Sequence, residues 1–328
     1  MHRSPRPSRG RRALPAAVLA AALLALTSCG ATSGGGQPSG ADAGEAPVAV
    51  ATTTQLGSVL EDITSCAGTT SVTLMGPGDD PHDYSPSSRQ VAQLARAGLV
   101  VANGLGLEAG MRSALDNARA DGATLLEVGP ELDPLPSDGE DQGHAPDDGH
   151  DHGEFDPHVW MDASRMAAAA GVIGAALAQQ TGDQEYDRCG EEVAGGLEDT
   201  DRQVREILSA VPPDRRTLVT DHAAYAYFAE AYGFEVAGVV VPGGSTDAEP
   251  SSERLAGLVA GMERDGADAL VMSAGSGNRL VQALSAETGG AVPVVELYEG
   301  GVGPESSGAE SYHDAMLASA RALADALS

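Results

Sequence analysis

The chain has 328 residues, 42% of them hydrophobic, three cysteines and a formal net charge of −29 at pH 7. This length and apolar content predict a globular protein of two lobes. The negative charge argues against nucleic acid as a partner. A cysteine-based zinc site is also disfavoured, because no cysteine has a CxxC partner.

The first 28 residues predict a signal peptide for export. Five arginines precede an apolar run over 13–26 that is too short to span a membrane as a mature helix. The run ends in LTSC, which resembles the bacterial lipobox, whose cysteine, here Cys29, is acylated and becomes the new N-terminus. We therefore expect a lipoprotein anchored to the outer face of the cell membrane, with residues 29–46, rich in Gly, Ser and Pro, as a flexible tether.

The two remaining cysteines are Cys66 and Cys189. An exported protein meets an oxidising environment, so we expect a disulfide between them. Two separately buried thiols are the alternative.

From Pro47 onward, short β-branched runs alternate with amphipathic stretches. This rhythm predicts an α/β fold of two lobes, each with a parallel sheet flanked by helices. The expected strands are residues 48–54, 71–75, 98–103 and 123–128 in the first lobe, and 217–220, 235–241, 269–272 and 292–297 in the second.

Two helices are expected between these sets of strands. Asp162 can cap a helix that runs to about Thr181, and a longer helix should occupy residues 183–209. The longer helix suits a rigid strut that joins an N-terminal lobe of residues 47–182 to a C-terminal lobe of residues 210–328.

Three of the eight histidines, His82, His158 and His222, lie in loops beside predicted strands or helices. Ligands gather at the carboxyl ends of strands in open α/β sheets, which favours binding roles for such positions. Separations of 76 and 64 residues are too wide for a zinc finger or for HExxH on one helix. A shared site would have to form in the cleft between the lobes, and three neutral imidazoles would suit zinc.

Spacing alone does not decide this, because lone surface histidines are more often solvated than ligating. The local sequences carry more information: DPHDYSPSS, GLVVANGLGLEAGM, FDPHVWMD and TDHAAYAYFAEAYGFEV occur in this order. Together they resemble the metal-binding solute receptors of bacterial ABC importers, the zinc-uptake family that is related to manganese receptors. The resemblance extends from Val48 to Leu327, and the lipobox agrees with it.

The resemblance implies that His82, His158 and His222 coordinate one Zn²⁺ ion between the lobes. The manganese and iron branch of the family has Glu where His222 stands. The family's fourth ligand is an acid in the loop after the last strand, at the position of Gly300. We expect Glu299, one residue earlier, to take this role. The alternatives are water or no fourth protein ligand, and Glu296 is a weaker substitute because it lies within the expected strand.

The loop 143–153 is rich in histidine and acids and has no periodicity. The same family often carries such a loop, so we expect His144, His150 and His152 to form an auxiliary zinc-collecting segment. A solvated acidic insertion is the alternative.

Three further features receive ordinary interpretations. Asp156 should orient its neighbour His158. His313 should face solvent on the last helix. Residues 273–280 resemble a phosphate loop at first sight, but they lack the Walker lysine and should begin a helix.

The predicted function is capture of zinc, without catalysis, and its delivery to an ABC permease. We expect a monomer, and the sequence leaves open whether a metallochaperone loads the site. Three alternatives remain: a manganese receptor of the same family, an adhesin-type surface lipoprotein, and a zinc hydrolase. The hydrolase is disfavoured because the chain has no HExxH or similar device.

Overall fold

The structure is a computed structural model that describes residues 47–137, 154–241 and 252–328 except 277. The predictions for the signal peptide, Cys29, the tether and the loop histidines His144, His150 and His152 lie outside the described residues. Within the described ranges, the structure contains no helix with the length and apolar character needed to cross a membrane.

The first sheet has the parallel strand order β2-β1-β3-β4. The four strands are shorter than predicted, at one or both ends. After β1, the side chain of Thr53 accepts a hydrogen bond from the backbone of Leu56 and begins helix α1. The bounds are β1 Ala49–Ala51, α1 Thr54–Cys66, β2 Ser71–Thr73, β3 Leu99–Ala102 and β4 Thr124–Glu127.

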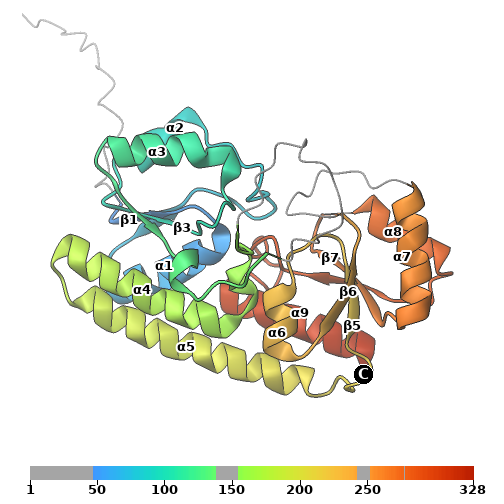
Figure 1. Ribbon diagram of the computed structural model, residues 1–328. Coiled ribbons are helices and arrows are strands. Elements are labelled where there is room, and N and C mark those ends of the chain that lie inside the picture. Colours follow the sequence, from blue (N-terminus) through green and yellow to red (C-terminus); the bar gives the residue numbers. More distant parts are fainter. Residues whose placement is uncertain (1–46, 138–153, 242–251, 277) are drawn as a thin grey trace, which may run out of the picture. The chain divides into compact units, whose positions relative to one another are not determined.

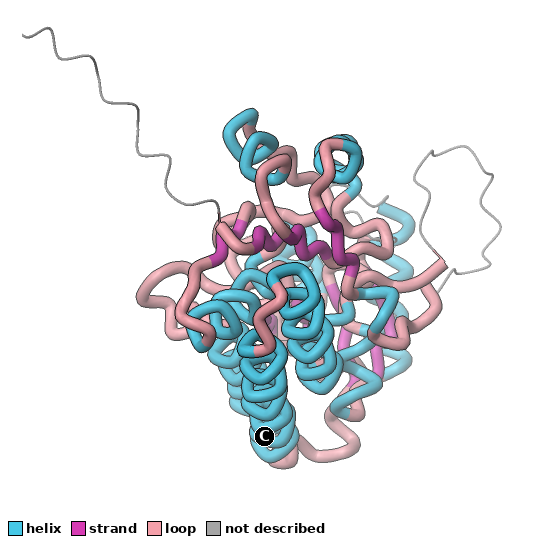
Figure 2. Tube along the Cα trace, turned by 90° about the vertical axis from the view of Figure 1, so that its left-hand side faces the viewer, coloured by secondary structure: helices cyan, strands magenta, loops and turns pink. Residues whose placement is uncertain are grey.

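Helices cover both faces of this sheet (Figure 2). Successive strand residues point to opposite faces, so Ala49 and Ala51 share a core with α1 and α4, whereas Val50 and Val100 share another with α2 and α3. Helix α2 covers Ser88–Leu94, α3 covers Arg112–Ala120 and α4 covers Ala163–Thr181, with short 3₁₀ turns at Ala109–Met111, Gly129–Glu131 and Val159–Met161.

The second sheet repeats the plan with the parallel order β6-β5-β7-β8. Helices α7 and α8 pack on one face, and α6 and α9 on the other. The segment 273–280 does lead into a helix, α8, which Asn278 caps. The bounds are β5 Thr217–Thr220, α6 Ala226–Tyr232, β6 Glu235–Val239, α7 Ser252–Asp265, β7 Ala269–Ser273, α8 Arg279–Glu287, β8 Val294–Leu297 and α9 Tyr312–Leu327.

The long helix α5, Glu185–Leu208, lies beside α4 and runs from the first lobe to the second (Figure 1). Asp162 caps α4, as predicted. The two helices approach closely where Gly174 of α4 faces Gly190 of α5. A Cβ atom on Gly190 would lie only 2.8 Å from the Cα atom of Gly174, so a larger residue would not fit there. A disulfide between Cys66 and Cys189 joins the end of α1 to α5.

One continuous hydrophobic core extends through both lobes. It contains Leu56 of α1, Trp160 before α4, Leu197 of α5 and Met316 of α9. The lobes are therefore packed against each other around α5, and this fixes the loops that meet between the two sheets.

Candidate metal centre

The three predicted histidines come together where the lobes meet. His82, His158 and His222 each offer a ring nitrogen, and these three atoms all lie within 4.8 Å of one another. The Nε2 atoms of His82 and His158 are 3.3 Å apart. Within the ranges that the structure describes, this is the one group of three or more such side chains close enough to share an ion.

His158 is held by the acid that precedes it by two residues. One carboxylate oxygen of Asp156 accepts hydrogen bonds from the backbone N–H of His158 at 2.9 Å and from its Nδ1 at 2.7 Å. Asp156 thus orients the ring, as predicted, and leaves Nε2 to face the other histidines.

His222 is held in the same way by Asp221, which follows β5 directly. Oδ1 of Asp221 accepts from the backbone N–H of His222 at 2.8 Å and from its Nδ1 at 2.9 Å. Oδ2 accepts from the backbone N–H of Ser273 at 2.9 Å, at the end of the neighbouring strand β7. This role of Asp221 was not predicted, although its place beside His222 resembles that of Asp156.

His82 lies in a turn after β2 and is only half-buried. Its backbone N–H donates to Oδ1 of Asp80 at 2.9 Å. The turn rests on Gly110, where an added Cβ atom would meet the carbonyl oxygen of Tyr84 at 2.6 Å. The hydroxyl of Tyr84 donates to the carbonyl of Leu74, which ties the turn back to the end of β2.

Glu299, in the loop after β8, faces the histidines and is 2% exposed. Its Oε2 lies 3.6 Å from Nε2 of His222, and its Oε1 lies 4.0 Å from Nε2 of His158. The hydroxyl of Ser273 donates to the same Oε2.

Glu296, the weaker candidate for the fourth ligand, lies exposed on β8. Its carboxylate accepts from the backbone N–H of Gly275.

The charges of the site depend on this proximity. Burial lowers the pKa of His222, but the Glu299 and Asp221 carboxylates outweigh burial and hold this pKa well above its ordinary value of 6.5. Burial raises the pKa of Glu299, but His222 outweighs it and lowers the pKa to about 2. Burial, followed by the neighbouring His158, lowers the pKa of His82 to about 4. These shifts favour an anionic Glu299, a protonated His222 and a neutral His82 at pH 7.

A buried polar network supports the loop that leads into His158. Glu108, which is 5% exposed, accepts from the hydroxyl of Thr52 at 2.8 Å and from the backbone N–H of Asn103 at 2.7 Å. The side chain of Asn103 donates to the carbonyl of Pro157 at 2.9 Å. No local pattern in the sequence marks these residues, because their roles appear only when strand ends far apart in the chain are brought together.

His313 is not part of the centre. The prediction that it faces solvent was wrong, because it is half-buried and its Nδ1 lies 2.7 Å from the hydroxyl oxygen of Thr200 on α5.

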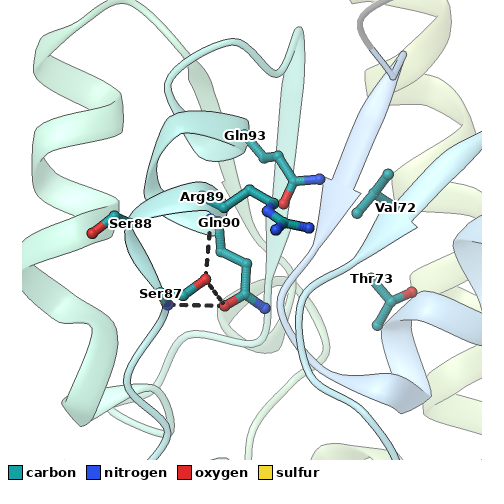
Figure 3. A pocket seen from close by; sticks show the side chains of 7 residues that line it. All are labelled: Val72, Thr73, Ser87, Ser88, Arg89, Gln90 and Gln93. Atoms are coloured by element: carbon teal, nitrogen blue, oxygen red, sulfur yellow. Dashed lines mark hydrogen bonds between the residues drawn. The ribbon is translucent and has the colours of Figure 1, made fainter. Parts of the chain in front are cut away.

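An open hollow of about 600 Å³ lies between β2 and the start of α2 (Figure 3). The capping box of α2, in which Ser87 and Gln90 exchange hydrogen bonds, forms part of its wall. Its lining offers hydroxyl, amide and guanidinium groups, but no histidine or carboxylate, and so does not resemble a metal site. The lining residues are Val72, Thr73, Ser87, Ser88, Arg89, Gln90 and Gln93.

Comparison with known proteins agrees with this geometry. The family described as "Zinc-uptake complex component A periplasmic" (ZnuA) matches residues 49–326. The manganese-binding lipoprotein MntA of Bacillus subtilis is 33% identical over 73% of this chain and 72% of its own length. The zinc-binding lipoprotein AdcA of Streptococcus pneumoniae strain R6 is 28% identical over 76% of this chain, which spans about half (50%) of that longer relative.

The fold has solved counterparts. The structure of the periplasmic zinc-binding protein TroA from Treponema pallidum superposes with a TM-score of 0.71 at 27% identity, and covers 87% of this chain and 100% of its own. The family match spans most of the chain and both lobes. The chain therefore belongs to the ZnuA family of metal-binding solute receptors of ABC importers, which are binding components of transporters and not enzymes.

Proposed function

We propose that this protein is an extracytoplasmic zinc receptor that binds one Zn²⁺ ion through His82, His158, His222 and Glu299 and delivers it to an ABC permease. The observation that carries the proposal is the convergence of three imidazole nitrogens within 4.8 Å of one another. Glu299 adds a buried carboxylate, whose oxygens lie 3.6 Å from Nε2 of His222 and 4.0 Å from Nε2 of His158.

The donor set favours zinc over manganese. Zinc prefers four ligands in a tetrahedral arrangement and binds imidazole nitrogen well, whereas manganese is more often held by carboxylate, carbonyl and water oxygens. Relatives are named for both metals. We therefore base the proposal of zinc on the chemistry of the ligands and not on sequence identity to any one relative.

The second contacts of the rings fit a metal centre. Asp156 and Asp221 each accept the Nδ1 proton of a histidine, which fixes the tautomer and makes Nε2 the nitrogen that can bind the ion. Zinc must displace the Nε2 proton of the protonated His222, which lies 3.6 Å from Oε2 of Glu299, so capture of the ion releases a proton.

We also propose a lipid anchor at Cys29 and an auxiliary zinc-collecting role for His144, His150 and His152. The anchor would keep the receptor beside the permease at the outer face of the membrane. The loop histidines would raise the local zinc concentration without forming part of the buried centre. Deleting residues 143–153 should then leave the high-affinity site intact.

Competition between Zn²⁺ and Mn²⁺ for the purified protein tests the proposal. We expect one tight site per chain that Zn²⁺ takes from Mn²⁺, and no hydrolysis of ester or peptide substrates. Displacement of Zn²⁺ by an equal concentration of Mn²⁺ would make the protein a manganese receptor instead. Loss of all zinc binding after deletion of residues 143–153 would show that the primary site is assigned wrongly.

A further inference from the structure

We propose that Gln55 and Trp160 are positioning residues for Glu299, because both donate hydrogen bonds to its backbone carbonyl oxygen from the opposite lobe. This inference rests on the proposed function, in which Glu299 is a metal ligand. It assigns to two uncharged side chains, which contact the backbone of Glu299, the task of fixing where its carboxylate lies.

The two donors converge on one buried atom. Nε2 of Gln55, in the first turn of α1, lies 3.3 Å from the carbonyl oxygen of Glu299, and Nε1 of Trp160 lies 2.7 Å from it. Each of the three residues is 2% exposed. A carbonyl oxygen has two lone pairs, so this pair of donors satisfies it fully inside the protein.

Two residues that follow Glu299 in its loop, Gly301 and Val302, also contact helix α1. The hydroxyl oxygen of Thr54 accepts from the backbone N–H of Val302 at 3.1 Å. Gly301 passes so close that an added Cβ atom would lie 2.4 Å from this hydroxyl oxygen. Since the backbone is held at residues 299 and 302, the first lobe determines the path of a loop that belongs to the second.

Trp160 also connects Glu299 to another proposed ligand. It follows His158 by two residues, and the centroids of the two rings are 5.2 Å apart. Its own carbonyl oxygen accepts from the hydroxyl of Tyr312 on α9 at 2.6 Å. One residue thus contacts both a histidine of the first lobe and the backbone of Glu299 in the second, and it constrains where the two residues lie relative to each other before an ion arrives.

The test compares Gln55→Leu and Trp160→Phe with a matched control, Ser58→Ala. Ser58 also lies on α1 and also makes a hydrogen bond across the lobe interface, accepting from the backbone N–H of Tyr312 at 3.0 Å, but it does not touch Glu299. Zn²⁺ affinity is measured by chelator competition, and the Zn²⁺ dissociation rate by rapid mixing, for the whole mature protein. Each variant is also made in a Glu299→Ala background.

We expect Gln55→Leu and Trp160→Phe each to weaken Zn²⁺ binding by about 10- to 100-fold, mostly through faster dissociation, since this is the usual cost of losing an outer partner of a ligand. Ser58→Ala should leave the affinity unchanged. In the Glu299→Ala background, the two substitutions should cause no further loss, because the ligand that they position is absent. If Trp160→Phe fails to fold, Gln55→Leu decides the matter alone.

Two results would overturn the inference, and they differ in what else they affect. If Glu299→Ala weakens binding while Gln55→Leu behaves like Ser58→Ala, the positioning role fails and the proposed ligand set stands. If Glu299→Ala leaves zinc affinity unchanged, Glu299 is not a ligand, and both this inference and that part of the proposed function fail.

Discussion

The four proposed ligands fall into two regions that are built differently. His158, His222 and Glu299 are buried, and each is fixed by partners within the fold: Asp156, Asp221, and the donors to Glu299. His82 is half-buried in a turn. Three donors are therefore held in place by the fold, whereas the fourth lies where an ion and water can reach it.

The same two regions also differ in the charges that their side chains carry. The buried region holds the ion pair of His222 and Glu299, and His82 is neutral at pH 7 because its pKa is lowered to about 4. We infer that zinc meets the neutral imidazole of His82 without competition from a proton, and that the proton to be displaced is in the buried region.

The largest expected effect comes from removing a buried ligand. His222→Ala should weaken Zn²⁺ binding by more than about 100-fold, beyond the usual cost of losing an outer partner, because Asp221 and Glu299 also lose the group that fixes them. His82→Ala should cost less, because water can take an open position on zinc at a half-exposed site. Equal losses in a chelator competition would remove the distinction between the two regions.

A second prediction concerns pH. Zinc binds the neutral imidazole, and the pKa of His222 is raised well above 6.5, so affinity should fall as pH falls below that raised pKa and rise as pH increases toward it. At pH 7, binding should release protons, which calorimetry in buffers of different ionisation enthalpy measures. Glu299→Gln should lower the pKa of His222 and reduce this release. Binding without proton release would contradict the charge assignment.

Loss of an orienting acid should have a smaller effect. Asp221→Asn should weaken zinc binding about tenfold, the low end for an outer partner, because the amide oxygen still accepts from Nδ1 but the charge is gone. Asp268 is a matched control, since its carboxylate accepts from the backbone N–H of Thr217 at the other end of β5. Asp268→Asn should not change the affinity, and a similar loss in both variants would assign the effect to the strand as a whole.

The smallest effect on affinity is expected from the disulfide. Replacing Cys66 and Cys189 together by Ala should lower the free energy of unfolding by about 2–5 kcal/mol, because the bond closes a loop across 123 positions of the chain. Zinc affinity should be unchanged, since the bond joins α1 to α5 and the ligands lie elsewhere. Denaturant unfolding and zinc titration of the same variant separate the two quantities.

Much of the fold could be predicted because its signals are local. The β-branched runs marked all eight strands of the described residues, and Asp162 marked the start of α4. The errors lie at strand ends: residues 52–54 continue the β-branched pattern of β1, but Thr53 caps a helix instead. Propensity cannot distinguish these outcomes, because threonine favours both strands and N-caps.

The site could be predicted only in part. Positions beside strand ends and a family resemblance pointed to His82, His158 and His222, which the structure brings together.

Contacts between residues far apart in the chain could not be predicted. The contact of Gln55 with Glu299 spans 244 residues of sequence, and nothing near Gln55 in the chain indicates it. His313 was misjudged for the same reason, because its partner Thr200 lies 113 residues away on another helix. Such pairs depend on how the lobes pack, which local patterns do not encode.

The most direct test of the zinc centre is anomalous diffraction at the zinc edge from crystals of the zinc-loaded protein. We expect one buried ion, about 2.0–2.1 Å from Nε2 of His82, His158 and His222 and about 2.0–2.2 Å from a carboxylate oxygen of Glu299. An ion bound away from these three imidazoles, or three rings that remain without zinc in the loaded protein, would contradict this ligand set.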